Sequence, residues 1–152
     1  MSRTLIIFFL IPFFATTGNA QTSSVQETDI KRIQAFIRDI ADPAIRADII
    51  LSQHVLIEET DTHEGYDYLE ASIEEIRVNL QTKNINDIHY IPFHELPKRE
   101  TRDIDPEGKP TNRMYFLQYK NRQMLAIYVA QDKIASFTLV SKGDKIAHFV
   151  TY

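Results

Sequence analysis

Apolar residues recur every three or four positions in three stretches of the first half of the chain. This spacing places them on one face of an α-helix. In the first stretch the recurring residues are Ile30, Ile33, Ile37 and Ile40. We therefore expect helices over about 27–41, 43–52 and 65–82. The second begins at Asp42–Pro43, a pair typical of a helix N-cap followed by the first helical position.

From Ile85 onward the hydrophobic period changes to two, which is typical of β-strands. The pattern predicts strands over about 87–95, 112–120, 123–131, 134–140 and 145–151. The connections after the second strand are short enough for antiparallel hairpins, with turns at 121–122, 132–133 and 141–144. Helices first and an antiparallel meander afterwards predict an α+β domain. We expect three N-terminal helices packed on a curved, mainly antiparallel sheet of four to five strands, with a cone-like shape.

Side chains alternate between the two faces of a sheet, so these turns assign each strand residue to a face. The face that the helices should cover then carries the candidate pocket residues Tyr115, Tyr128, Phe137 and His148. The opposite face carries Met114, Phe116, Leu125, Ile127, Val129 and Phe149. A contiguous exposed apolar patch usually marks an interface, so we predict a homodimer formed through these six residues. The alternative is that the first helix or the 97–112 segment covers this face and makes it core.

The segment 97–112 is the longest stretch without a periodic pattern, and it contains charges of both signs. Its prolines and Gly108 argue against regular structure, and Ile104 is the apolar residue that could anchor it. So little apolar surface does not offset the entropy cost of ordering a chain. We predict a long charged loop that is mobile and dispensable for folding.

Residues 1–20 read as a secretory signal peptide. Arg3 supplies the positive charge, Leu5–Phe14 is an apolar run, and Gly18 and Ala20 are small residues before a cleavage site. A membrane anchor needs about 20 apolar residues, and this run is shorter. We expect export to a bacterial periplasm or secretion, with no membrane insertion after cleavage. The remainder would be a flexible tail over 21–26 and a single domain over 27–152.

The amino-acid composition excludes several classes of function. The chain of 152 residues has 43% hydrophobic and 25% charged residues and a net charge of −4, as in ordinary globular domains. Mild acidity gives no basic face for nucleic acid. The chain contains no cysteine, which excludes disulfides, thiol catalysis and cysteine-ligated metals. His89 and His94 fall on opposite faces of a regular strand, so we expect no metal site and no cofactor.

Proton transfer is the chemistry that the residues leave open. His148, with Tyr115 or Tyr128, would lie on the apolar face beneath the helices, where burial perturbs the pKa of such groups. The simpler interpretation is a core histidine bonded to a neighbour. No Gly-x-Ser-x-Gly elbow and no Gly-rich phosphate loop occurs in the sequence.

The order of elements over 27–152 resembles the nuclear transport factor 2-like superfamily, which includes domains of the ketosteroid isomerase and scytalone dehydratase type. The resemblance lies in element order and not in a residue motif. It implies helices seated in a bent sheet, an internal pocket, and dimers formed through the outer sheet face. Isomerase members use a carboxylic acid and a tyrosine inside the cone, whereas the inner face predicted here has no Asp or Glu. Cystatin-like domains are the competing layout, with one principal helix.

Three functions follow as hypotheses. The first is an exported, non-enzymatic binding or interaction module for a small apolar ligand or a protein partner. The second is an isomerase- or dehydratase-like enzyme that uses His148 with Tyr115 or Tyr128. The third is a structural dimeric module. A cavity between helices and sheet, and the groups that line it, would discriminate between them.

Overall fold

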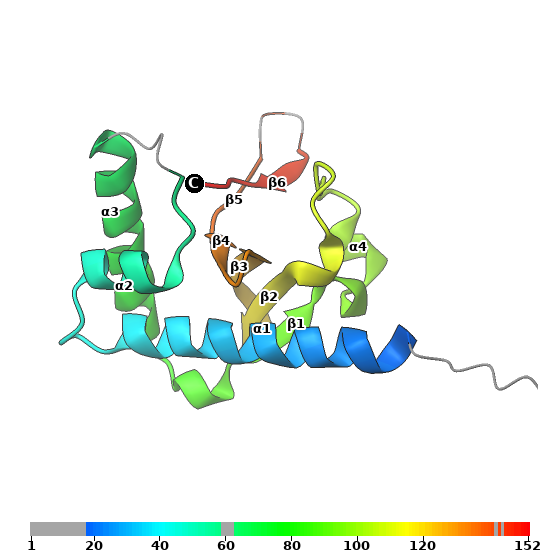
Figure 1. Ribbon diagram of the computed structural model, residues 1–152, viewed down its shortest axis with the longest axis horizontal. Coiled ribbons are helices and arrows are strands. Elements are labelled where there is room, and N and C mark those ends of the chain that lie inside the picture. The colour runs from blue at the N-terminus through cyan, green and yellow to red at the C-terminus, as the bar shows by residue number, and fades with distance from the viewer. Residues whose placement is uncertain (1–17, 59–62, 142, 144) are drawn as a thin grey trace, which may run out of the picture.

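The computed structural model describes residues 18–58, 63–141, 143 and 145–152 (Figure 1). Three helices come first: α1 (Gly18–Ala41), α2 (Ala47–His54) and α3 (His63–Leu80). A four-stranded antiparallel sheet has the order β1 (His89–Pro92), β2 (Met114–Tyr119), β3 (Arg122–Ala130) and β4 (Lys133–Ser136). A separate two-stranded sheet pairs β5 (Leu139–Ser141) with β6 (Ala147–Phe149). The predicted α+β class is confirmed.

The predicted leader lies almost wholly outside the described residues, and α1 begins at Gly18. This start is earlier than the predicted one, so α1 includes the stretch 21–26 that we expected as a flexible tail. The added residues are mostly polar, so apolar residues do not recur there at the helical spacing, and the sequence does not predict this part of the helix. A Thr28 to Ser24 hydrogen bond of 2.8 Å and a Glu27–Lys31 ion pair of 2.6 Å stabilise the turn where it joins the apolar part of the helix. No described helix is long and apolar enough to cross a bilayer.

The second helix begins later than predicted, because Asp42 and Pro43 form a turn of their own. The Asp42 carboxylate accepts a hydrogen bond from the amide of Ala44 at 2.9 Å, and the Asp42 carbonyl accepts one from Ile45 at 3.2 Å. Asp–Pro is as typical of a turn as of a helix start. After α2, Val55 forms a parallel bridge with Ile134, so the chain runs along the free edge of β4.

Arg77 links α3 to the end of α1 and to the α1–α2 connection. The Arg77 side chain is buried, and it donates to the carbonyl of Ile40 at 2.8 Å and to that of Ile45 at 2.5 Å. These carbonyls lie at and just beyond the end of α1, where backbone acceptors lack helical donors. Glu74 forms an ion pair with the same guanidinium at 2.7 Å. Arg77 therefore holds the α1–α2 connection against α3.

The hairpin turns of the sheet lie one residue earlier than predicted. They are Lys120–Asn121 and Gln131–Asp132, and all four residues have positive φ, as two-residue hairpins of this kind require. A β-bulge between Leu117 and Gln118 then shifts the register of the first hairpin by one residue, so Tyr115 pairs with Ile127 and Tyr128 pairs with Met114. The predicted grouping of Tyr115 with Tyr128 on one face is wrong, because a one-residue shift exchanges the faces of a strand.

The helices therefore cover a different set of residues. The cluster packed against them includes Tyr115, Leu117, Ile127, Val129, Ile134 and Phe137. A second cluster on the other face comprises Leu96, Met114, Phe116, Ala126, Tyr128, Ala135 and Phe149. Figure 1 shows α1 running across one side of the sheet, with α2 and α3 near the C-terminal end of α1.

The six residues predicted to form a dimer interface do not form an exposed patch. Met114, Phe116, Ile127, Val129 and Phe149 are each at most 2% exposed, and Leu125 is half-buried. Ile127 and Val129 lie beneath the helices, and Leu125 packs against the same cluster. Met114, Phe116 and Phe149 belong to the second cluster, together with Phe93, Leu96 and Ile104. The alternative considered above is correct in part: the segment that follows β1 makes this second face core.

The segment 97–112 is structured, contrary to prediction. It contains the short helix α4 (Lys98–Thr101) and runs beside β6, where Ile104 forms a parallel bridge with Ala147. The Ala147 amide donates to Asp103 at 2.7 Å, and the Asp105 amide donates to Ala147 at 2.8 Å. This segment is ordered by backbone hydrogen bonds and by one apolar anchor. Every residue carries the same backbone groups, so the sequence does not show where such bonds form.

Candidate functional site: the α3–β3 groove

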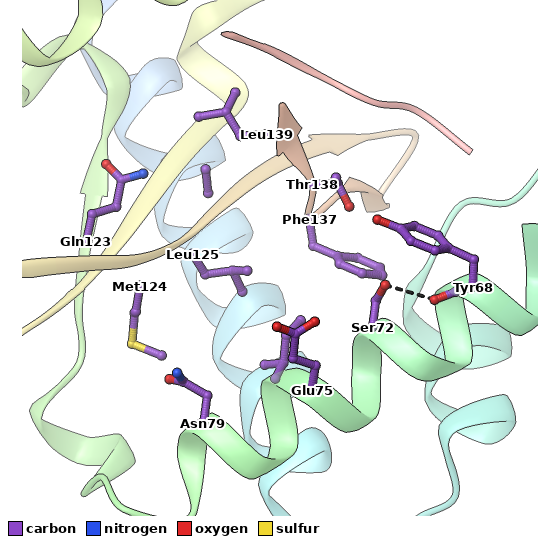
Figure 2. A pocket seen from close by; sticks show the side chains of 12 residues that line it. Tyr68, Ser72, Glu75, Asn79, Gln123, Met124, Leu125, Phe137, Thr138 and Leu139 are labelled. Carbon is purple, nitrogen blue, oxygen red and sulfur yellow. Dashed lines mark hydrogen bonds between the residues drawn. The ribbon is translucent and has the colours of Figure 1, made fainter. Parts of the chain in front are cut away.

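A groove of about 380 Å³ lies between α3 and the sheet, close to the start of β3 (Figure 2). We call it the α3–β3 groove. One wall is a stripe of α3, and the other is formed by residues 123–126 of β3 and residues 137–139 beyond β4. Pockets for small ligands commonly have volumes of about 300–1,000 Å³, so the groove has the size of a binding site.

The α3 wall follows from the helical period. The stripe that lines the groove consists of Tyr68, Ser72, Glu75, Ile76 and Asn79. The buried stripe of the same helix is Leu69, Ile73, Arg77 and Leu80, displaced by one position from most of these residues. The helix therefore buries one face in the core and presents the adjoining flank to the groove. The Ser72 hydroxyl bonds the Tyr68 carbonyl at 2.8 Å, as Figure 2 shows.

The sheet wall is held in place by the C-terminal residue. The Tyr152 hydroxyl accepts a hydrogen bond from the Phe137 amide at 3.2 Å and lies 2.5 Å from the Thr138 hydroxyl. The rings of Phe137 and Tyr152 pack with centroids 5.0 Å apart. Burial raises the pKa of Tyr152 above its ordinary value, so its hydroxyl keeps its proton further into the alkaline range. These contacts hold the chain where it leaves β4 and turns into β5.

The chemistry of the groove is amphipathic. Ile76, Met124 and Leu125 supply half-buried apolar surface, whereas hydroxyl and amide groups come from Tyr68, Ser72, Asn79, Gln123 and Thr138. Glu75 is exposed and is the one carboxylate among the described lining residues, which include no histidine. The groove can combine apolar contact with neutral hydrogen bonds. It lacks a paired acid and base of the kind that proton transfer requires.

The residues predicted to form the site do not come together. Phe137 lines the groove, but Tyr115, Tyr128 and His148 do not. Tyr115 lies under the helices, and Tyr128 lies in the second cluster against Phe149, with ring centroids 6.2 Å apart. His148 is buried on β6, and its Nε2 has no hydrogen-bond partner among the described residues. The hypothesis of a His148–tyrosine pair in one pocket is not supported by these positions.

Sequence reasoning missed a buried polar cluster around Asp29. The Asp29 carboxylate is 1% exposed, and it lies 2.6 Å from Arg113 Nε, 3.1 Å from Arg32 and 3.0 Å from the Tyr115 hydroxyl. Asp132 lies 3.3 Å from Arg32 on the exposed side. Burial and, after it, the neighbouring Asp29 carboxylate raise the pKa of Tyr115, so its hydroxyl keeps its proton further into the alkaline range. The cluster joins α1 to β2, and its role is structural.

The described residues contain no group of three or more His, Asp or Glu side chains placed to hold a metal ion. His89 lies on β1 and His94 on the 3₁₀ turn Phe93–Glu95, and both are exposed. No protein-family model, no curated protein and no solved structure matches the chain. The resemblance of its element order to the nuclear transport factor 2-like superfamily stays a prediction.

Proposed function

We propose that the protein is a non-enzymatic binding module that holds its ligand in the α3–β3 groove. The observation that carries this proposal is the lining of the groove, whose apolar residues are buried or half-buried and whose polar residues are half-buried or exposed. Its walls belong to an 18-residue helix and to paired strands. Binding groups on such rigid elements are positioned before the ligand arrives, which lowers the entropy cost of binding.

The groove supports binding better than catalysis. Its hydroxyl and amide groups are neutral, and its single carboxylate faces water. His148, the histidine considered above for proton transfer, lies on β6 and does not line the groove. A neutral, amphipathic lining discriminates ligands by shape and hydrogen bonding.

The leader supports export as the setting of this function. Leu5–Phe14 is an apolar run between Arg3 and the small residues Gly18 and Ala20. Expression in a bacterium with intact export should yield a periplasmic chain whose first residue, read by mass spectrometry, is Gln21. A chain retained in the cytoplasm with residues 1–20 attached would contradict export.

The groove can be tested with a neutral fluorescent reporter, N-phenyl-1-naphthylamine, whose emission rises in apolar surroundings. We expect the unmodified chain and the Ser72→Ala variant to bind it, because alanine keeps the helix and leaves the groove open. Ser72→Trp should abolish binding, since the indole would occupy the space between α3 and β3. Circular dichroism should show all three folded. Equal binding by Ser72→Trp, or none by the unmodified chain, would contradict the proposed function.

A further inference from the structure

The edge of β3 is open where the groove meets it. β2 pairs with β3 from Arg122 to Tyr128, whereas β4 pairs with it only from Tyr128 to Ala130. Residues 122–127 therefore have a neighbouring strand on one edge alone among the described residues. Unpaired N–H and C=O groups on such an edge are a template for another strand. Proteins usually block such edges, so an unblocked one requires an explanation.

The α3–β3 groove occupies the position of the missing strand. Four consecutive residues, 123–126, line it. Leu125 packs against the cluster beneath the helices and Ala126 belongs to the second cluster, so their side chains lie on opposite faces of β3, and a space that both border reaches the edge of the strand. Residues 137–139, where the chain turns away from β4, close one end of the groove. The space therefore continues the path of β4 along β3.

A positive patch lies at the other end of this path. It consists of Lys83, Lys120 and Arg122 around the Tyr119 ring, and it adjoins the groove through Asn79, Gln123 and Met124. Lys83 Nζ lies 5.9 Å and Lys120 Nζ 5.4 Å from the ring centroid. None of the three cations forms an ion pair with another described residue, and no acidic side chain lines the patch. We call these three residues the basic patch.

We infer that the ligand of the groove is an extended polypeptide segment that adds to β3 as an antiparallel strand and places its C-terminal carboxylate on the basic patch. This inference rests on the proposed function of the groove. β4 runs antiparallel to β3, from beside Ala130 to beside Tyr128. A strand that continues this direction ends beside Arg122. The opposite orientation would place an N-terminal ammonium group against three cations, so charge selects the antiparallel one.

The length of the edge and its surroundings define the segment further. Six residues, 122–127, correspond to about 20 Å of extended chain, or a hexapeptide. Backbone hydrogen bonds to the edge supply affinity without regard to sequence, and alternate side chains supply specificity. Side chains directed toward α3 would meet Ile76 and Met124, which favours apolar residues, with Ser72 and Asn79 available to polar neighbours. Glu75 lies one helical turn from Asn79, on the side away from the expected C-terminal carboxylate of the peptide.

The test compares two pools of random hexapeptides, one with free C-terminal carboxylates and one amidated, passed over the immobilised chain. We expect the free-acid pool to be retained at least tenfold better. Arg122→Glu should remove this preference, whereas Lys98→Glu, the same charge change on exposed α4, should keep it. With an enriched peptide bound, amide hydrogen exchange should slow within residues 123–127.

Retention of both pools to the same extent, or of neither, would overturn the inference. So would retention without slower exchange at residues 123–127. A chain that is dimeric and already protected at these amides without peptide would show that a second copy occupies the edge, which also overturns it. Binding of the neutral reporter is independent of charge. If the reporter binds and the peptides do not, the groove is a binding site, and only the peptide assigned as its ligand is wrong.

Discussion

The Tyr115 hydroxyl donates a hydrogen bond to Oδ2 of Asp29 over 3.0 Å, and this contact joins α1 to β2 in the interior of the protein. Asp29 is 1% exposed, so its charge has lost nearly all contact with water. Arg113 and Arg32 compensate from 2.6 and 3.1 Å. A buried charge is tolerated when partners surround it, and removal of one partner leaves the rest uncompensated.

This cluster predicts an ordered series of stabilities. Asp29→Asn should lower the free energy of unfolding by about 3–5 kcal/mol, because it leaves the Arg113 and Arg32 charges without their buried counter-ion. Tyr115→Phe should cost less, about 1–3 kcal/mol, because it removes one donor only. Urea unfolding followed by circular dichroism measures both. Asp29→Asn with an unchanged midpoint would show that the cluster contributes no stability.

Arg77 provides a second prediction about stability. Arg77→Met keeps most of the apolar stem but removes the donors to the carbonyls of Ile40 and Ile45, so the free energy of unfolding should fall by about 2–4 kcal/mol. Arg38→Met is the matched control. Arg38 is exposed and has one ion pair of 3.4 Å, so its loss should change stability by less than about 0.5 kcal/mol. Similar effects of the two substitutions would refute the role assigned to Arg77.

Tyrosine burial predicts a loss of stability at alkaline pH. Burial raises the pKa of Tyr90 to about 12, above its ordinary value of 10.0. The folded state therefore keeps this proton after the unfolded state releases it, so stability is complete below about pH 10 and falls as pH rises toward 12. Tyr90→Phe removes the proton and should make the decline shallower by up to about 1.4 kcal/mol per pH unit. An identical slope in both chains would contradict this linkage.

The second core cluster predicts that the 97–112 segment is required for folding. Ile104 anchors this segment beside β6 and packs with Phe116 and Phe149 in one cluster. Ile104→Asp should destabilise the chain by several kcal/mol, because it places a charge in an apolar contact. Ile127→Glu should unfold it, since Ile127 is fully buried, and should not produce a folded monomer. A folded Ile127→Glu chain, seen by circular dichroism, would revive the interface hypothesis.

The helices were predictable because their signal is local. Ile33, Ile37 and Ile40 recur at the helical period, and all three are at most 1% exposed. The α+β order followed from the change of period at Ile85. The faces of the strands were not predictable, because β-bulges between Leu117 and Gln118 and between Tyr128 and Val129 each shift the register by one residue, and the hydrophobic pattern does not mark them. Lys120–Asn121 and Gln131–Asp132 contain no glycine, so nothing in residue type marked them above their neighbours.

The candidate site was predictable only in part. Phe137 was expected in a pocket and lines the groove. The rest depends on where β4 separates from β3, which is set by contacts of Thr138 and Phe137 with Tyr152 at the end of the chain. Such contacts join residues distant in sequence. Asp29 was missed for the same reason, since its partners Arg113 and Tyr115 lie far along the chain.

The central claim is that the α3–β3 groove binds a ligand, and chemical-shift mapping on the isotopically labelled chain tests it most directly. On titration with N-phenyl-1-naphthylamine, we expect amide shifts at residues 123–126 and 137–139 and along the groove-facing stripe of α3. Amides of α4 and of the segment beside β6 should not move. Shifts centred on α4 or the second core cluster, or no shifts at saturating reporter, would contradict the claim.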